Sequence, residues 1–283
     1  MNPYVIREPE AKEILNSIIT MLRSFDRPHI NETEKERDVW LYLIKNELAK
    51  FYIALKNNKI IGIGGLFLFQ NVGSIGYMGV LPGYRNQGVG AGIFQKLKQT
   101  AIDAGCKTIN LYASKLGEPI YRKSGFQGEF SANMYLMPNI SPKIPLMNKN
   151  LKIVSKSPDW LLDLDREAVG FDRSDYLKAR ISLGAKLIVI ENEGYGLLSN
   201  IFNSVRLGPV IASNIEVAVD IIGEGISLGA KSMIIPKHPA FQNEIIRLIG
   251  LAEQGKPNLK MVYGEKIKRK INYLYAVGTY AKG

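Results

Sequence analysis

The sequence has few of the residues that build disulfide frameworks and metal centres. Its 283 residues include one cysteine, Cys106, and two histidines, His29 and His238. A single cysteine excludes an internal disulfide, and so few cysteines and histidines argue against a zinc site of the usual ligand types. We therefore expect no metal. Because no histidine lies near Cys106 in the sequence, we expect a small buried side chain there rather than a nucleophile.

Long apolar runs are also missing. No run approaches the ~20 apolar residues that a membrane span requires, and the N-terminal stretch MNPYVIREPEAKEIL has no basic segment leading into an apolar one. These features predict a cytoplasmic protein without a membrane partner. The net charge of +11 favours an anionic partner, either a nucleotide-like cofactor or RNA. Nucleic acid is the weaker candidate, because the basic and aromatic segment around Tyr273 and Tyr275 alternates like a strand.

The length of the chain favours two domains, since domains commonly have roughly 100 to 200 residues. A proline-rich stretch without periodicity, PNISPKIPLMNKN, spans residues 138–150 and predicts the boundary, with domains at residues 1–140 and 146–283. The first domain is predicted to mix strands and helices. Strands are expected at residues 4–9, 51–69 (a hairpin), 74–81, 107–113 and 129–138, and helices at residues 10–25, 34–50, 90–105 and 116–126.

A glycine-rich stretch, GVLPGYRNQGVGAGIF, lies between a predicted strand and a predicted helix at residues 79–94. It lacks the Gly-Lys-Ser/Thr of a Walker loop and the Gly-x-Gly-x-x-Gly of the dinucleotide fingerprint. What remains is Val80-x-Pro82, then Arg85-x-x-Gly88-x-Gly90, then a helix. Glycines let backbone N–H groups approach an anion at the positive end of the helix dipole. The pattern therefore predicts a loop that binds a pyrophosphate.

These residues resemble the GNAT superfamily of N-acetyltransferases. Residues 80–90 are similar to its acetyl-CoA motif, and YRKSGF, from Tyr121 to Phe126, is similar to its later Tyr-x-x-x-Gly-Phe signature. The resemblance covers residues 1 to about 140 and departs at Ser114, seven residues before Tyr121, where the family often has Asn. It implies an α/β fold in which a mixed, mostly antiparallel sheet is flanked by helices.

The resemblance also implies a reaction. A primary amine would attack the thioester of acetyl-CoA directly while both substrates are bound, and Tyr121 would protonate the departing thiolate. A purely structural role for the Tyr121 ring stays open, and the strand SIGYMGV offers no Asp, Glu or His as a base. The cofactor-binding residues that the resemblance implies are Met78, Gly79, Val80, Arg85, Asn86, Gln87, Gly88, Val89, Gly90, Ala91 and Ser114.

The second half reads as a repeat of the same fold without the cofactor loop. GAKSMII at residues 229–235 aligns with GCKTINL at residues 105–111. Val80 precedes Gly105 by 25 residues, whereas Val210 precedes Gly229 by only 19, so that about six residues are missing where the anion loop would be. Ile246 takes the place of the signature tyrosine. We therefore expect tandem GNAT-like domains of which only the first binds acetyl-CoA.

The second half is also similar to the accessory domain of a two-domain GNAT subgroup, which helps to shape the acceptor site. This similarity makes Asp172, Arg173 and Arg206 candidates for substrate contact. His29, between the first two helices, lies in a region that borders the acceptor site in this family, and the role of an ordinary loop residue stays open for it. Asp172 is equally suited to cap the helix that follows it. The acceptor is expected to be a small-molecule amine or a protein amine. Transfer of a longer acyl group, and a CoA-binding sensor or interaction module without turnover, remain as alternatives.

Overall fold

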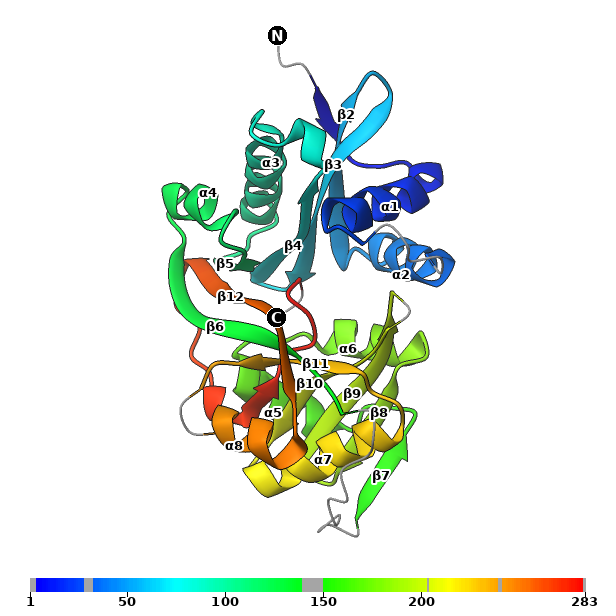
Figure 1. Ribbon diagram of the computed structural model, residues 1–283, viewed down its shortest axis with the longest axis vertical. Helices are drawn as coiled ribbons and strands as arrows, with labels where there is room; N and C mark the ends of the chain where they lie inside the picture. The colour runs from blue at the N-terminus through cyan, green and yellow to red at the C-terminus, as the bar shows by residue number, and fades with distance from the viewer. Residues whose placement is uncertain (1–3, 28–32, 139–149, 203, 239–240, 282–283) are drawn as a thin grey trace. The chain divides into compact units, whose positions relative to one another are not determined.

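The chain folds into two compact units. The structure, a computed structural model, describes residues 4–27, 33–138, 150–202, 204–238 and 241–281. The first unit comprises the described residues up to Tyr112 together with Val262–Glu265, and the second comprises those of Ala113–Met261 and Lys266–Ala281. Each unit is a mixed, mostly antiparallel sheet flanked by helices (Figure 1), as the sequence predicted.

In the first unit, helices cover both faces of a sheet with the order β1-β2-β3-β4-β5. Strands β1 to β4 pair antiparallel, and β5 pairs parallel to β4. Figure 1 shows α1 and α2 on one side of β3 and β4, and α3 on the other. The elements are β1 Val5–Arg7, η1 Ala11–Glu13, α1 Ile14–Ser24, α2 Glu34–Lys45, β2 Ala49–Lys56, β3 Lys59–Phe69, β4 Val72–Val80, η2 Pro82–Tyr84, α3 Val89–Asp103 and β5 Thr108–Ala113.

The second helix is shorter than the sequence predicted. The pattern over residues 34–50 indicated one helix, but α2 ends at Lys45 and β2 begins at Ala49. Glu47 adopts a left-handed backbone conformation (φ 57°), and the Leu48 N–H donates to the Leu43 carbonyl. This Schellman-like closure ends the helix at Lys45, although apolar residues with helical spacing continue beyond it.

In the second unit, the sheet order is β12-β6-β11-β10-β9-β8-β7, with β13 paired to β10. The elements are α4 Glu118–Lys123, β6 Gln127–Leu136, β7 Leu151–Val154, α5 Asp159–Val169, α6 Ser174–Ser182, β8 Lys186–Ile190, β9 Gly194–Ile201, β10 Ser204–Ala212, α7 Ile215–Ser227, β11 Ser232–Pro236, α8 Gln242–Ile249, β12 Ala252–Gly264, η3 Ile271–Tyr273 and β13 Leu274–Ala276. The last residues of β12, from Val262, are counted with the first unit.

The contacts divide the chain earlier than the predicted linker at residues 138–150, most of which lies outside the described residues. The reason is β6, which pairs with β11 from Ala132↔Pro236 to Leu136↔Ser232. The hydrogen bonds of this pairing connect β6 to a strand that lies about 100 residues further along the chain. The segment from Ala113 to the linker is therefore counted with the second unit, although it precedes the linker in the sequence.

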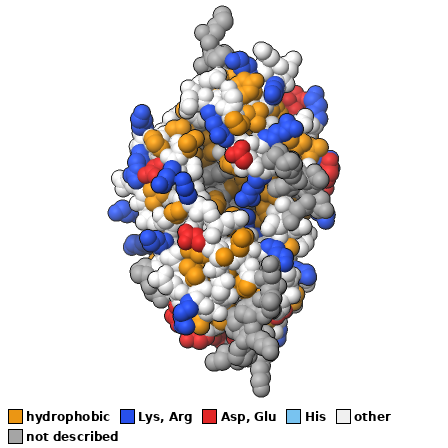
Figure 2. All heavy atoms as spheres, viewed as in Figure 1, with side chains coloured by type: hydrophobic (Ala, Val, Ile, Leu, Met, Phe, Trp, Pro, Cys, Tyr) orange, Lys and Arg blue, Asp and Glu red, His pale blue; other side chains and the backbone are white. Residues whose placement is uncertain are grey.

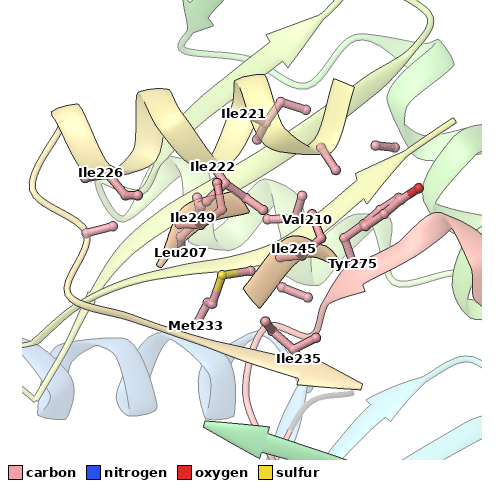
Figure 3. Packing of buried hydrophobic residues seen from close by; sticks show 14 of the residues in the cluster. Leu207, Val210, Ile221, Ile222, Ile226, Met233, Ile235, Ile245, Ile249 and Tyr275 are labelled. Carbon is pink, nitrogen blue, oxygen red and sulfur yellow. The ribbon is translucent and has the colours of Figure 1, made fainter. Parts of the chain in front are cut away.

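The core of the second unit lies between its sheet and the helices α7 and α8. Figure 3 shows side chains of both helices meeting those of β10, β11 and β13. Ala218, Ile221 and Ile222 of α7 and Ile245 and Ile249 of α8 are buried there. Ile221 and Ile222 follow Ala218 by three and four positions, and Ile249 follows Ile245 by four, as on the apolar face of a helix. Figure 2 shows Lys and Arg side chains scattered over the visible face rather than gathered in one block. The positive charge is thus distributed on that face.

Several charged side chains are nevertheless buried in the second unit. The guanidinium of Arg173 donates two hydrogen bonds, of 2.8 and 2.9 Å, to the carboxylate of Asp165. Tyr195 donates its hydroxyl to the same carboxylate. Lys260, on β12, is 2% exposed, and burial together with the positive charge of Arg269 lowers its pKa to about 7, although Glu129 acts in the opposite direction. Charging this lysine inside the fold is therefore unfavourable.

Replacing Lys260 with methionine, which has a similar volume, should raise the melting temperature at pH 7. The folded protein binds the lysine proton only below about pH 7, whereas the unfolded chain holds it up to roughly pH 10.4. The stability of the wild type therefore rises between these pH values, and the advantage of Lys260→Met should shrink between pH 7 and pH 9.5. Melting curves of both proteins at the two pH values measure this. Lys256→Met, on the exposed part of β12, is the control and should show no such pH dependence; an equal shift in both variants would contradict the burial argument.

Candidate functional site

The turn between β4 and α3 is built around two left-handed residues. It spans residues 81–88 and begins with η2, which has Pro82 at its first position. Asn86 (φ 60°) and Gly88 (φ 79°) take left-handed backbone conformations. Such a conformation costs glycine little and other residues more. The turn therefore brings the chain into α3 at Gly88, the first glycine of the Arg85-x-x-Gly88-x-Gly90 motif.

The start of α3 is open to an anion. Gly88 is the N-cap and has no side chain that could satisfy the first N–H groups of the helix. The intrahelical bonds begin with Gly92 N–H donating to Gly88 O at 2.9 Å. The N–H groups of Val89, Gly90 and Ala91 therefore have no acceptor within the helix and lie at the positive end of its dipole. This arrangement is the one that binds phosphate groups at helix N-termini.

Arg85 ties the turn to its surroundings. Its Nε donates to the carbonyl oxygen of Val80 at 3.1 Å. Its Nη2 donates at 2.8 Å to the carbonyl oxygen of Ser24, which is the last residue of α1. The sequence suggested either an anchoring or a phosphate-facing role. These two bonds are anchoring contacts, and they connect the end of β4 with the end of α1.

Strand β4 leaves its neighbour β5 before it ends. The two strands pair from Val72↔Thr108 to Ile75↔Leu111, and the described residues show no β4–β5 pair beyond this point. Opposite β3 the register also shifts, because Tyr77 and Met78 face the single residue Gly64. Tyr77 lies in the left-handed region (φ 55°), as in a β-bulge. Beyond Ile75, β4 therefore continues without a described pairing to β5, and the carbonyl of Val80 accepts a hydrogen bond from Arg85.

Gly79 of β4 is required by the packing of the first unit, which the sequence did not reveal. A Cβ atom at Gly79 would clash with Ser24 Oγ. The close approach that the sequence attributed to a cofactor at this position is thus already made by α1. Tyr77 was not singled out from the sequence, since nothing in its residue type indicates a bulge.

The second unit repeats this architecture with the site closed. Only Ser213 and Asn214 separate β10 from α7, where residues 81–88 separate β4 from α3. The side chain of Asn214 accepts a hydrogen bond from Val217 N–H at 2.9 Å and so caps α7. The end of β13 lies between β10 and β11, because Ala276 pairs with Val210 and Val277 bridges to Ile234. In the second unit, the side chain of Asn214 thus occupies the N-terminus of α7, and β13 occupies the position beside β10.

Tyr121 and Ser114 are counted with the second unit and lie around α4. Tyr121 is 7% exposed, and burial raises the pKa of its hydroxyl to about 12. The phenol therefore keeps its proton throughout the neutral range. Ser114 Oγ accepts a hydrogen bond of 3.3 Å from Gly117 N–H, and the Ser114 carbonyl accepts one from Glu118 N–H. Ser114 thus stabilises the turn that leads into α4, the helix that holds Tyr121.

The predicted acceptor residues have different surroundings. Asp172 is partly buried and accepts hydrogen bonds from Ser174 N–H at 2.8 Å and from Arg166 at 3.4 Å, so it stabilises the start of α6. The Arg173 side chain is 1% exposed and is held by Asp165. Arg206 is half-buried on β10, opposite Ser199 and Ser232. His29 lies outside the described residues.

A further group of residues in the first unit was missed from the sequence. Glu36, on α2, is 4% exposed and accepts a hydrogen bond of 3.2 Å from the indole N–H of Trp40. The Trp40 ring stacks on Phe51 at 4.0 Å and on Tyr77 of the β4 bulge at 5.2 Å between centroids. In the run EKERDVW the spacing of four between Glu36 and Trp40 was the available signal, but four charged neighbours made the segment look solvent-exposed.

Comparisons with known proteins agree with this geometry. Residues 15–126 match the acetyltransferase (GNAT) family, and residues 161–276 match an acetyltransferase (GNAT) domain. The uncharacterized N-acetyltransferase YitH of Bacillus subtilis is 30% identical over 239 residues, which are 79% of this chain and 81% of that protein. The crystal structure of a putative acetyltransferase from Pyrococcus horikoshii superposes with a TM-score of 0.90 at 27% identity, covering 100% of this chain and 97% of that one.

A third similarity concerns the fold alone. A tandem GNAT protein from the clavulanic acid biosynthesis pathway has a TM-score of 0.61 at 9% identity and covers 92% of this chain and 98% of that one. Among the described residues, no three His, Cys, Asp or Glu side chains gather in a way that could hold a metal ion. No described helix is long and apolar enough to cross a membrane.

The two hydrogen bonds of Arg85 give a prediction for the stability of the turn. A lysine has one ammonium group and does not reproduce the fork of a guanidinium. Arg85→Lys should therefore lower the free energy of unfolding by about 1–2 kcal/mol, measured by urea denaturation. The control is Arg23→Lys in the last turn of α1, where the side chain is exposed. Equal stability of the two variants would show that the Arg85 bonds contribute nothing.

Proposed function

The chain belongs to the GNAT acetyltransferase family and is an N-acetyltransferase, and we propose that its first unit transfers an acetyl group from acetyl-CoA to a primary amine. The amine attacks the thioester directly while both substrates are bound. The observation that best supports this proposal is the open N-terminus of α3 behind a strand that separates from its neighbour. An anion site next to a strand edge that is not paired to β5 is what a molecule with a pyrophosphate and a long amide-containing arm requires.

The residues of the turn fit this cofactor. Its pyrophosphate would accept hydrogen bonds from backbone N–H groups within residues 86–91, and its pantetheine arm would lie along the part of β4 beyond Ile75, which does not pair with β5. When bound, acetyl-CoA supplies the activated acyl group. The protein positions that group and polarises the thioester carbonyl with backbone N–H groups of β4, which favours the developing oxyanion.

Tyr121 is the proposed acid. Burial raises the pKa of its hydroxyl to about 12, so the side chain carries its proton throughout the neutral range. In the reaction the amine nitrogen bonds to the carbonyl carbon, the carbon–sulfur bond breaks, and the thiolate of CoA takes the proton of Tyr121. The attacking nitrogen releases one proton to solvent as the amide forms, and the phenolate regains a proton from solvent.

We assign one acetyl-CoA to each chain. The second unit lacks six of the eight residues of the turn, its helix N-terminus is capped by Asn214, and β13 lies beside β10. Asp172 and Arg206 remain proposed contacts to the acceptor, and so does His29. The proposal does not extend to Arg173, because its guanidinium is buried against Asp165.

Two alternatives use the same turn. A longer acyl group would bind through the same pyrophosphate contacts and differ only beyond the thioester. A CoA-binding module without turnover is favoured by the lack of an acidic or basic side chain on β4 and by Ser114 in place of the family's Asn. Release of free CoA from acetyl-CoA and longer acyl-CoA thioesters, measured with a panel of primary amines, separates the three functions. Absence of amine-dependent release with every thioester would leave only the binding module.

The stoichiometry of binding tests the turn. Isothermal titration with CoA should give one site per chain, and Gly90→Val should abolish it, because side-chain atoms would lie over the N–H groups at the start of α3. A Cβ at Gly90 makes an ordinary 3.5 Å contact with Val80, so the fold should tolerate the change. Gly83→Val is the control, since a Cβ there meets nothing within 4 Å. Two sites per chain, or normal affinity of Gly90→Val, would refute the assignment.

The role of Tyr121 is tested with Tyr121→Phe. With an accepted amine, kcat should fall by about 100- to 10,000-fold, as is typical for loss of a positioned acid, while the affinity for acetyl-CoA stays the same. The hydroxyl acts only when the thiolate forms, which explains why binding should not change. Tyr273→Phe, a partly exposed tyrosine in η3, serves as the control. An unchanged kcat of Tyr121→Phe at neutral and alkaline pH would restrict Tyr121 to packing.

A further inference from the structure

The first unit contains a buried carboxylate that the proposed reaction does not use. Glu36 is 4% exposed, and its one hydrogen bond among the described residues comes from the neutral indole N–H of Trp40, at 3.2 Å. The other acidic side chains of α2 are exposed, and Glu34 and Asp38 both form ion pairs with Arg37. No described lysine or arginine pairs with Glu36. Its negative charge is thus removed from water without a described cation to balance it.

Such a charge is expensive to bury. A carboxylate loses favourable hydration inside a protein, and a neutral donor restores only part of it. Retention of the charge makes physical sense if a cation reaches the site during the working cycle, because attraction to a cation is much stronger there than at the surface. The structure offers a reason to expect such a cation close by.

Two contacts link Glu36 to the strand assigned to the cofactor. Trp40, which donates to Glu36, stacks on Tyr77 with the ring planes 17° apart. Tyr77 lies in the β4 bulge and is followed directly by Met78 and Gly79. Tyr77 and Met78 are only partly buried, unlike Trp40. The carboxylate is therefore linked through Trp40 and Tyr77 to the part of β4 that we assign to the thioester.

We propose that Glu36 binds the ammonium group of the acceptor and makes the enzyme selective for amines that are positively charged in solution. Tyr77 contributes a cation–π contact to the bound ammonium, which then releases one proton to solvent so that its nitrogen can attack the thioester. This inference rests on the proposed function and deepens it, since it names the class of acceptor: a protonated aliphatic amine rather than a neutral aromatic one. Glu36 is a specificity-determining residue in this proposal.

A purely structural role for Glu36 predicts a different outcome. If the carboxylate only orients Trp40, the amide oxygen of glutamine can accept the same indole hydrogen bond, and Glu36→Gln should behave as the wild type. If its charge binds the acceptor, Glu36→Gln should keep the fold and lose the preference. The substitution Glu34→Gln, on an exposed position of the same helix, is the matched control.

The experiment compares two probe amines, n-butylamine, which is protonated at pH 7.5, and aniline, which is neutral. Acetyl-CoA is saturating, and CoA release gives kcat and KM. Relative to wild type, Glu36→Gln should raise the KM for n-butylamine about tenfold or more, as expected for a lost hydrogen bond between charged groups. The KM for aniline should change little, and Glu34→Gln should match the wild type for both amines. Equal KM values of Glu36→Gln and wild type, or an equal loss for both amines, would overturn the inference.

Two further measurements cover the remaining outcomes. If Glu36→Gln does not fold at the assay temperature, the variant Trp40→Phe tests the inference instead, because it keeps the charge of Glu36 and removes the indole donor. A retained preference for n-butylamine supports the inference, and a lost preference overturns it.

If wild type releases no CoA with any amine, the proposed function fails on its own. Titration calorimetry with n-butylamine then tests Glu36 separately, since binding to wild type and not to Glu36→Gln supports the carboxylate site, and equal or absent binding refutes it.

Discussion

The first unit depends on the early separation of β4 from β5. Pairing stops at Ile75↔Leu111, and the bulge at Tyr77 and Met78 turns the rest of β4 away. A strand that continues without one neighbour exposes backbone donors and acceptors, which must be satisfied by something else. The turn after Val80, the Arg85 bonds that fix it and the open end of α3 all follow from where this strand goes. The bulge also turns Tyr77 toward Trp40, and thus toward Glu36.

The second unit shows what the same architecture becomes when these groups are satisfied internally. Its β10 also has a register irregularity, between Leu207 and Val210, but β13 pairs with the strand from Val210 onward. Asn214 supplies the side-chain acceptor that Gly88 lacks. A glycine N-cap leaves N–H groups for a ligand, whereas an asparagine N-cap stabilises the helix and uses one of them. One fold is thereby divided between a unit with an open site and a unit whose equivalent site is closed.

The two units also bury charge in different ways. In the second unit, Arg173 and Asp165 form a buried ion pair with Tyr195 as an additional donor, so the charges satisfy each other. Burial and the positive charge of Arg269 lower the pKa of Lys260 in the same unit to about 7. In the first unit, Glu36 has a neutral partner among the described residues. A matched pair is characteristic of structure, while a charge balanced only by neutral groups is suited to a ligand of opposite sign.

The sequence by itself determined the family, the two halves and the difference between them. The glycine and arginine spacing of the turn, the signature at Tyr121 and the loss of six residues before Asn214 are local features, since a tight turn or a helix end requires particular residue types at short, fixed distances. The tertiary structure alone decided the rest. The bulge at Tyr77, the insertion of β13 beside β10, the bonds of Arg85 to Ser24 and the burial of Glu36 all join segments that are distant in the sequence or depend on register. A single sequence contains no periodicity or spacing that encodes such pairings, because they are selected by how strands and helices pack together.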